Sequence, residues 1–520
     1  MVKGDDVWLL VEDQWNDYGF QTSYTLYRID GLDIVTVGGV KILRRGQPYG
    51  DFPLPRGPLP DARLPEDCIS LGASLDYYAQ LVAFGRPLAS NMLSRMRDLS
   101  ADTDLETAFR AEEGLEKSLH RSVAEPADYY FDARSVIETG GLPPRANAFS
   151  FDFQPSESVP AITFEFAARR GEGSQARLPS RRTIILIGEN GAGKTHLLAS
   201  LARVAYAAPA ERGALKEFGR IEPDDTVFPG LMAVSYSAFD TFKPPALEGD
   251  IREEVANKVR DGTGRYSYCG MRDLAAHISD PDAPEKLIAP NELEAMFVDR
   301  LNRIRESQRL QAFALAMAPA LGENSMSRYL PAPEAADKGK PADLDAVALA
   351  KTEAFLSLDP AASFRGLSSG HKIVAHLLAG ITASIRRRSL VLIDEPETHL
   401  HPPLLAALMA GIRRLLDRFE AYAIIATHSP VVAQETLSSQ VFVVEGEGVV
   451  RRPGIQTFGE NTGALTREIF GLHTEATEHR RMLDLMAQDF ADPEAVERAL
   501  GEPLSGQALA FILSKQRNKR

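Results

Sequence analysis

The stretch Gly188-Glu-Asn-Gly-Ala-Gly-Lys194-Thr195 decides how this 520-residue chain folds. It fits the pattern GxxxxGK[ST], and it lies between an apolar run, Thr183–Ile187, and a helical pattern, His196–Val204. Glycines at these positions let backbone N–H groups surround phosphate oxygens, and the start of a helix adds the positive end of its dipole. The sequence therefore predicts a strand, a phosphate-binding loop and a helix in this order, with a chance glycine-rich turn as the alternative.

The residues of this loop are expected to have different roles in binding a nucleotide and its Mg²⁺. Lys194 is expected to reach the β- and γ-phosphates of a nucleotide, and the hydroxyl of Thr195 is expected to bind Mg²⁺. The full set of expected nucleotide-binding residues is Gly188, Glu189, Asn190, Gly191, Ala192, Gly193, Lys194, Thr195 and His196.

A second apolar run, Leu390–Ile393, is followed by two carboxylates. Asp394 is expected to hold Mg²⁺, mostly through water, as the acidic partner of the phosphate-binding loop. Glu395 is the candidate for polarising the water that attacks the phosphate. A strand that is merely capped by acids is the alternative, and the presence of Gly188–Thr195 in the same chain disfavours it.

Two further segments combine a helical pattern or an apolar run with polar residues that could contact a phosphate. Gly366-Leu-Ser-Ser-Gly-His-Lys372 opens the helical pattern Lys372–Ile385, and the apolar run Ala423–Ala426 leads to His428. Each is weak alone, because Ser-Ser-Gly is an ordinary helix N-cap and a single histidine at a strand end is usually a satisfied polar residue. All the segments together resemble the ATP-binding-cassette (ABC) family of ATPases. The resemblance implies ATP and Mg²⁺ as cofactors and an α/β fold with a mixed or parallel core sheet and a helical lobe.

The resemblance also implies roles for single residues. His428 matches the switch histidine of the family, so the expected catalytic residues are Lys194, Glu395 and His428. Ser368 and Gly370 would contact the γ-phosphate that a second copy of the chain binds, which gives a dimer with composite sites. The expected signature residues are Leu367, Ser368, Ser369, Gly370 and Lys372, although Ser369 and His371 depart from the family's LSGGQ pattern.

The segment Asp394-Glu-Pro-Glu397-Thr-His399-Leu-His401 resembles the loop of the solitary, non-transporter cassette ATPases, which include SMC/RecF-type repair ATPases and the ATPase halves of OLD nucleases. Glu397 and His399 are expected to make contacts across the dimer. A metal site on His399 and His401 is the alternative, and the lack of an adjacent third ligand disfavours it.

One residue of the family pattern is missing. Cassette ATPases carry a glutamine after the second core strand, but no glutamine occurs between Arg212 and Gln308 here. Ser237 or Asp240 are the candidates to replace it.

Composition excludes several classes of protein. A net charge of −14 with 44% hydrophobic residues excludes a disordered or fibrous chain and disfavours unspecific coating of DNA. The two cysteines, Cys68 and Cys269, lack a CxxC spacing, which excludes a disulfide scaffold and a Cys-rich zinc site. The uncharged window Ala421–Gln434 is shorter than the ~20 residues that span a bilayer. We therefore expect a cytoplasmic protein that does not enter a membrane.

Three parts are expected along the chain: an N-terminal α+β accessory module (1–147), a cassette ATPase domain (148–470) with a helical lobe at about 245–365, and a helical C-terminal tail (471–520) that could dock a partner. The module's expected strands are 7–12, 22–28 and 33–43, and its expected helices are 75–84, 87–99 and 104–120. A continuous helical pattern covers 292–317, and Arg386–Arg388 is expected to be a helix end rather than a DNA-binding patch.

The C-terminal segments Thr457–Gly463 and Leu465–Gly471 resemble PtuA-type ATPases of the Septu antiphage systems. In those systems the ATPase works with a separately encoded HNH endonuclease. The resemblance implies that this chain is the ATPase subunit of a defence complex and controls a partner nuclease. Phe442–Gly446 is similar to the first strand of the TOPRIM nuclease fold, but no DxD pair follows it, so a nuclease within the chain is disfavoured.

Two other functions stay open from the sequence. One is a DNA-repair ATPase of the RecF/SMC type, with nucleic acid as its partner. The other is a scaffold that binds ATP to stabilise an assembly and rarely turns it over.

Overall fold

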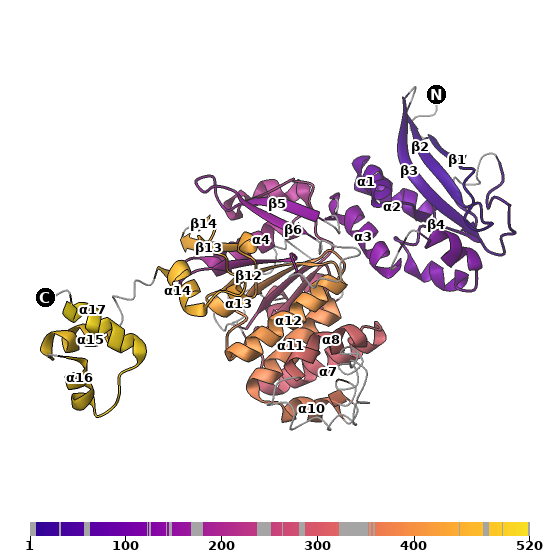
Figure 1. Cartoon of the computed structure of the whole chain (residues 1–520). Coiled ribbons are helices and arrows are strands. Elements are labelled where there is room, and N and C mark those ends of the chain that lie inside the picture. The colour runs from indigo at the N-terminus through magenta and orange to yellow at the C-terminus, as the bar shows by residue number, and fades with distance from the viewer. Residues whose placement is uncertain are drawn as a thin grey trace.

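The computed structural model describes residues 7–30, 33–56, 63–121, 123, 126–141, 143–144, 148–167, 180–236, 251–262, 264–279, 286–321, 352, 355–356, 359–446, 448–471, 478–490 and 492–517. Its centre is a seven-stranded sheet in the order β10-β9-β11-β12-β7-β13-β14 (Figure 1). All neighbouring pairs are parallel except β13 with β14. The strands are β7 (Thr183–Ile187), β9 (Leu231–Ser235), β10 (Tyr266–Gly270), β11 (Leu390–Asp394), β12 (Tyr422–Thr427), β13 (Val441–Gly446) and β14 (Val449–Arg451).

The core strands are buried on both faces, as their continuous apolar sequences predict. Alternate residues of β7 enter different cores: Ile185 and Ile187 face one, and Ile184 and Leu186 face the other. The mixed α/β fold with a largely parallel sheet is therefore confirmed.

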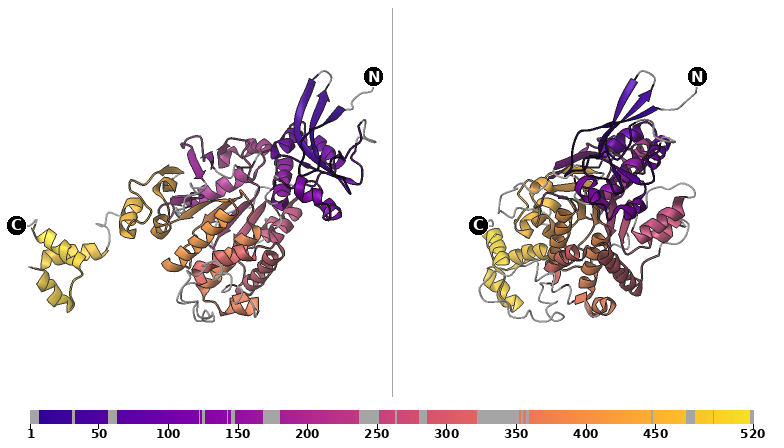
Figure 2. Two further views of the ribbon diagram at one scale, coloured as in Figure 1. Left: turned by 45° about the vertical axis from the view of Figure 1, so that its right-hand side comes forward. Right: turned by 90° about the vertical axis from the view of Figure 1, so that its right-hand side faces the viewer.

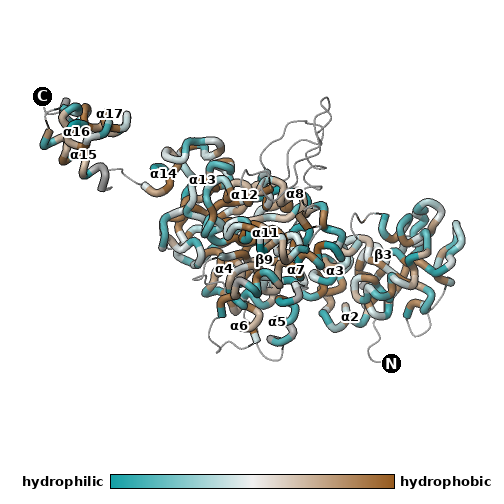
Figure 3. The backbone as a smooth tube through the Cα atoms, turned by 90° about the horizontal axis from the view of Figure 1, so that it is seen from below, coloured by the Kyte–Doolittle hydropathy of each residue, from teal (hydrophilic) through white to brown (hydrophobic). Residues whose placement is uncertain are grey.

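Helices and a small sheet cover these two faces. The first core contains residues of α7 (Pro290–Glu306), α8 (Leu310–Leu321), α11 (Ser369–Ser384), α12 (Pro402–Arg418), α13 (Pro430–Gln434) and α14 (Thr462–Phe470). The second contains residues of α4 (Lys194–Tyr206) and of the antiparallel sheet β6-β5-β8, with β5 (Ala148–Gln154), β6 (Ile162–Ala167) and β8 (Arg220–Glu222). Figure 3 shows hydrophobic segments gathered around β9 and α11 at the centre of the molecule.

The range 245–365, where a helical lobe was predicted, also contains a strand. β10 lies between α5 (Ile251–Asp261) and α6 (Leu274–Ser279) and joins the central sheet as its edge strand. One prediction for this range was wrong. The pattern 292–317 is two helices rather than one, since Gln308 adopts φ +56° between α7 and α8. A left-handed residue interrupts the i→i−4 hydrogen bonds of a helix.

The N-terminal residues form their own antiparallel sheet, β1-β2-β3-β4. Its elements are β1 (Val7–Glu12), β2 (Ser23–Asp30), β3 (Asp33–Arg44), β4 (Cys68–Gly72), α1 (Leu75–Ala83), α2 (Arg86–Arg95) and α3 (Pro126–Thr139). The sequence missed β4 and α3. The predicted helix over 104–120 was wrong: a 3₁₀-helix (Thr103–Phe109) and a π-turn (Leu115–Leu119) replace it. Gly114 separates them, and a Cβ there would lie 2.5 Å from Leu43 Cδ1, so the chain is held tightly against β3.

Arginines after α11 connect the N-terminal module to the central sheet's domain. The guanidinium of Arg386 lies 3.7 Å from the ring centroid of Phe131, and Arg388 forms an ion pair with Asp132. Both partners belong to α3. The run Arg386–Arg388 thus follows a helix end, as predicted, and two of its side chains serve a contact within the chain.

The C-terminal helices α15 (Glu478–Asp489), α16 (Pro493–Leu500) and α17 (Gly506–Arg517) pack on one another through Ala487, Val496 and Ile512. The left view in Figure 2 shows this unit, in yellow, apart from the central domain. Across the described residues, no helix is both long and apolar enough to cross a membrane.

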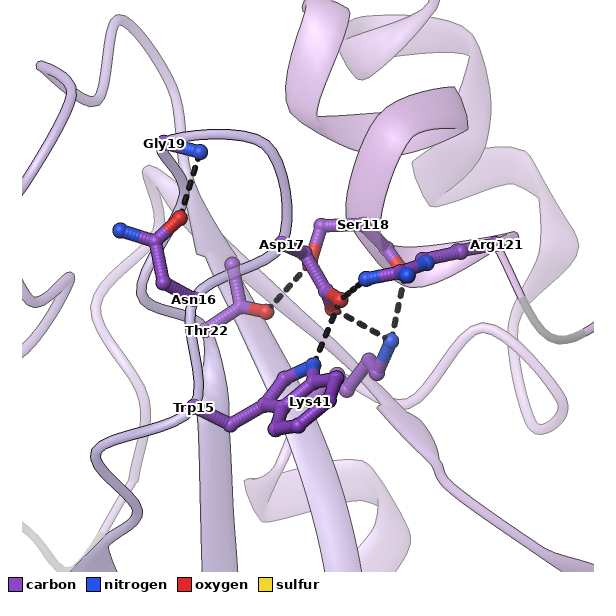
Figure 4. A network of polar contacts seen from close by, with 8 residues as sticks. All are labelled: Trp15, Asn16, Asp17, Gly19, Thr22, Lys41, Ser118 and Arg121. Atoms are coloured by element: carbon purple, nitrogen blue, oxygen red, sulfur yellow. Dashed lines mark hydrogen bonds and ion pairs between the residues drawn. The ribbon is translucent and has the colours of Figure 1, made fainter.

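A buried carboxylate organises the N-terminal module (Figure 4). Asp17 is 1% exposed and accepts hydrogen bonds from Lys41 Nζ at 2.7 Å, Trp15 Nε1 at 2.8 Å and Ser118 Oγ at 3.0 Å. Arg121 forms a further ion pair with it. Burial by itself raises the pKa of Asp17, but the bonds with Lys41, Trp15, Arg121 and Ser118 outweigh it and lower the pKa to about 2. The ionised carboxylate is therefore stabilised by the fold.

Replacing Asp17 by Asn is expected to destabilise the module by about 2–3 kcal/mol at pH 7, because the folded pKa of about 2 lies below the ordinary 3.8. A lowered folded pKa stabilises the fold above about pH 4, and this contribution disappears as the pH falls toward 2. The difference between wild type and Asp17→Asn should shrink over the same interval.

Tryptophan fluorescence during urea unfolding measures this directly, since the chain's two tryptophans, Trp8 and Trp15, both lie in the module. Asp51→Asn, a change of an exposed acid in the same module, is the control. Equal unfolding midpoints for Asp17→Asn and Asp51→Asn at pH 7 would contradict the assignment.

Candidate functional site

The predicted site residues meet because three of the strands that carry them are parallel neighbours. β11 pairs with β12, and β12 pairs with β7. Their carboxyl ends therefore lie at the same edge of the sheet, which is where α/β proteins bind ligands. The phosphate-binding loop follows β7, Asp394 ends β11, and His428 follows β12.

The loop after β7 adopts a conformation that depends on its glycines. Gly191 and Gly193 have φ +83° and +90°, in the left-handed region that other residues rarely occupy. A Cβ on Gly188 would lie 2.4 Å from the carbonyl oxygen of Val444, so this position tolerates only glycine. The loop then enters α4, which begins at Lys194.

Lys194 is 4% exposed and folds back over the loop. Its ammonium donates to the carbonyl oxygens of Gly188 at 2.9 Å and Glu189 at 2.8 Å. Burial lowers the pKa of Lys194, and the nearby carboxylates of Glu395 and Asp394 oppose this shift. The Lys194 ammonium therefore lies against the backbone of the loop that the sequence predicts to bind phosphate.

Thr195 and Asp394 form the second half of this centre. The Thr195 hydroxyl lies 3.0 Å and 2.9 Å from the two carboxylate oxygens of Asp394, whose side chain is almost fully buried. A hydroxyl and a carboxylate side by side are hard oxygen ligands. They fit Mg²⁺, which binds one or two protein oxygens and fills its other positions with water and phosphate.

Glu395 and His428 face each other across the ends of β11 and β12. Glu395 has φ +47°, an unusual conformation for a residue with a side chain, and its N–H donates to the carbonyl oxygen of Ala426 at 2.9 Å. The carboxylate Oε1 lies 3.6 Å from Nδ1 of His428. Local strain of this kind is characteristic of functional sites.

The structure places Glu397 beside His428, a position that the sequence did not predict. We expected it to make contacts across a dimer, but its side chain is only 8% exposed and is engaged within its own chain. Its Oε1 accepts hydrogen bonds from Thr427 Oγ1 and from the backbone N–H of His428, both at 2.6 Å, and lies 3.0 Å from His428 Nδ1. Glu397 therefore positions His428. The two residues are 31 positions apart, so only the fold brings them together.

The signature segment forms the start of α11. Ser368 is the N-cap, and its hydroxyl lies 2.7 Å from Nδ1 of His371. Ser368 and Ser369 are exposed, Leu367 is buried, and Lys372 is partly buried. The end of the helix that carries the signature hydroxyls is accessible from outside the chain.

The signature helix packs on the segment that follows Glu397. A Cβ on Gly370 would lie 2.9 Å from Leu404 Cδ2, and the carbonyl oxygen of His399 is nearby. His401 is the N-cap of α12, where its Nδ1 accepts from the N–H of Leu404 at 3.4 Å. This gives His401 a local role in the chain that requires no metal.

The signature residues do not complete the phosphate-binding loop of their own chain. Within the residues that the structure describes, Ser368, Ser369 and Gly370 make no hydrogen bond or ion pair with Gly188–Thr195. The candidates for the missing glutamine, Ser237 and Asp240, lie outside the described residues.

A cavity of about 450 Å³ adjoins the phosphate-binding loop on the side of β13 and α14. Its walls include Glu189–Ala192, Glu445, Arg451 and Phe470. Arg451 and Phe470 were not among the predicted site residues. Phe470 lies in the segment Leu465–Gly471, whose resemblance to PtuA-type ATPases gave no hint of a place beside the phosphate-binding loop.

Replacing Glu397 by Ala is expected to cost about 1–3 kcal/mol of stability, because the hydroxyl of Thr427 and the N–H of His428 lose their acceptor. Glu397→Gln is the matched control, since its amide oxygen can still accept both bonds. Urea unfolding followed by circular dichroism compares the two. An equal loss for Ala and Gln would show that these bonds do not stabilise the site.

Comparisons with known proteins give similarities in sequence and in structure. Residues 279–433 match the family model described as "AAA domain, putative AbiEii toxin, Type IV TA system". Two solved structures of ABC transporters are similar in part. CbiO1 of Clostridium perfringens is 14% identical, with 65% of this chain and 98% of that chain covered and a TM-score of 0.27. A nucleotide-free ATP-binding cassette is also 14% identical, with coverages of 61% and 93% and a TM-score of 0.26.

Similarity over nearly the whole chain comes from a phage protein. Protein ea59 of Escherichia phage lambda is 30% identical over 489 residues, which cover 91% of this chain and 87% of ea59. The chain thus belongs to the family of protein ea59 of phage lambda, and its residues 279–433 match an AAA-domain family model.

Proposed function

We propose that two copies of this chain bind ATP between them, hydrolyse it, and thereby control a separately encoded nuclease in an antiphage defence complex. The observation that carries the dimer is the exposed N-terminus of α11. Ser368 and Ser369 are accessible, and among the hydrogen bonds of the described residues none joins them to the phosphate-binding loop of their own chain. A second copy would bring this helix end, with its positive dipole, to the γ-phosphate.

The residues of one chain supply the rest of the chemistry. Lys194 and the loop amides bind the phosphates, and Thr195 with Asp394 would hold Mg²⁺. When bound, Mg²⁺ neutralises charge on the phosphate oxygens. Glu395 accepts a proton from the attacking water, and Glu397 keeps His428 directed toward the γ-phosphate. The cavity lined by Arg451 and Phe470 takes the nucleoside of ATP, with the aromatic ring as an apolar wall.

The nuclease partner rests on the resemblance of the C-terminal segments to PtuA-type ATPases. The described helices α15–α17 add a suitable docking unit, because they pack as a cluster of their own and expose Met482, Leu485 and Leu513. Co-purification with an HNH-type protein supports this part. Full antiphage activity of the chain expressed alone would overturn it.

Shared sites predict complementation between two inactive chains. Lys194→Ala disables phosphate binding, and Ser368→Arg disables the signature, so each alone should lack turnover. In an equal mixture half of the dimers are mixed, and each mixed dimer has one intact site. ATPase activity should therefore return to roughly a quarter of the wild-type rate. No recovery, with mixed dimers demonstrated by tag capture, would refute shared sites.

Glu395→Gln tests turnover itself. Loss of the proton acceptor is expected to lower kcat by roughly 10²–10⁴-fold, to trap ATP and to prolong the dimer. Glu306→Gln, which changes an exposed acid at the end of α7, is the control. A scaffold that rarely hydrolyses ATP would be altered little by Glu395→Gln. Strong stimulation of wild-type turnover by DNA alone would favour a RecF-type repair ATPase.

A further inference from the structure

A second cavity, of about 540 Å³, lies away from the phosphate-binding loop. It is enclosed by β10, the end of α5, the start of α6, α7 and the C-terminal half of α11. None of the residues that line it belongs to Gly188–Thr195 or to the Asp394–Glu397 segment. Its volume is in the range of sites that bind small molecules. Nothing in the proposed ATPase cycle uses this cavity.

Arginines dominate the polar part of the lining. Four guanidinium groups contribute to it, those of Arg260, Arg272, Arg300 and Arg303. Arg272 and Arg300 are 4% and 5% exposed. Fully buried arginines are rare, since removing a charge from water is costly unless an anion compensates it.

The acids of the cavity already have partners. Asp299 forms an ion pair with Arg303 at 3.2 Å, and Glu292 forms one with Lys286 at 2.7 Å. Asp273 accepts a hydrogen bond from the N–H of Ala276 at 3.0 Å. None of these three carboxylates forms an ion pair with Arg300.

Arg300 is the decisive residue because its contacts are neutral. Its Nη1 donates to Nε2 of His376 at 2.8 Å and to the carbonyl oxygen of the same residue at 3.3 Å. Burial, and secondarily the charge of Arg300, lowers the pKa of His376 far below its ordinary value, so the imidazole is uncharged. Among the described residues no carboxylate lies within 4.0 Å of the Arg300 guanidinium. A buried cation therefore borders the cavity, and the part of the chain that the structure describes places no carboxylate beside it.

Two glycines let the guanidinium groups lie close to the backbone. A Cβ on Gly380 of α11 would lie 3.0 Å from Arg300 Nη1, and one on Gly262 would lie 2.2 Å from Arg303 Nη1. Gly262 has φ +65°, which also requires glycine. The arrangement of the arginines is therefore built into the backbone around the cavity.

We propose that this cavity binds a small molecule that carries an oxyanion, a phosphate or a carboxylate, beside Arg300. The apolar residues Met232, Leu274 and Met296 also line the cavity and would contact the body of the ligand. Gly380 and Ser384 of α11 belong to the same wall, and α11 begins at the signature. An occupied cavity thus touches the helix whose other end carries Ser369.

Thermal unfolding of the full chain tests the site with inorganic phosphate as the probe. Measurements are made with saturating Mg·ADP, and phosphate is compared with chloride at equal ionic strength. The wild-type midpoint should rise with phosphate concentration, because a ligand that binds the folded state stabilises it. Arg300→Met should abolish the rise. Arg305→Met, an exposed arginine of the same helix, should leave it intact.

A second variant keeps the proposal testable if Arg300→Met does not fold. Ala295→Trp places a large ring at the wall of the cavity without changing its charge, and it should also abolish the rise. Repeating the titration with citrate distinguishes a carboxylate ligand from a phosphate ligand. The proposal is overturned if neither anion stabilises the wild type, or if both variants respond to phosphate as the wild type does.

Discussion

The parallel pairing of β11, β12 and β7 is the constraint on which the rest of the structure depends. It aligns the carboxyl ends of three strands, so the phosphate-binding loop, Asp394 and His428 occupy one edge of the sheet. Because of this alignment, Thr195 Oγ1 after β7 is within hydrogen-bond distance of the Asp394 carboxylate at the end of β11. A shift of one residue in this register would turn Asp394 to the opposite face and separate the two oxygen ligands.

A chain of contacts leads from this edge to the signature helix. Glu397 holds His428, and the segment that follows Glu397 packs against Gly370 at the start of α11. The acidic strand, the histidine and the signature are thus parts of one packed unit. A change in the contacts of Glu395 or His428 can therefore affect Ser368 through only a few packed residues. Ser368 is the residue that we propose contacts the second copy.

The helix α11 also connects two chemically different sites. Its N-terminus carries exposed hydroxyls, and its C-terminal half forms part of the wall of the arginine-lined cavity. Both ends favour anions, one through the positive end of the helix dipole and the other through guanidinium groups at the cavity. The two sites would therefore act on the same rigid element from opposite ends.

The order of the sequence motifs determined the class of fold and the composition of the phosphate-binding centre. Short continuous apolar runs bounded by polar loops fit strands that are covered on both faces, and the pattern GxxxxGK[ST] between such a strand and a helix is typical of a phosphate-binding loop. The positions of β4, α3 and β10 were not predictable, because short or partly polar segments gain their structure from neighbours in space. The roles of Glu397 and Arg300 depend on residues 31 and 76 positions away in sequence. Local pattern carries no information on such pairs, so only tertiary packing decided which carboxylate orients the histidine and which arginine is buried against a histidine at the cavity.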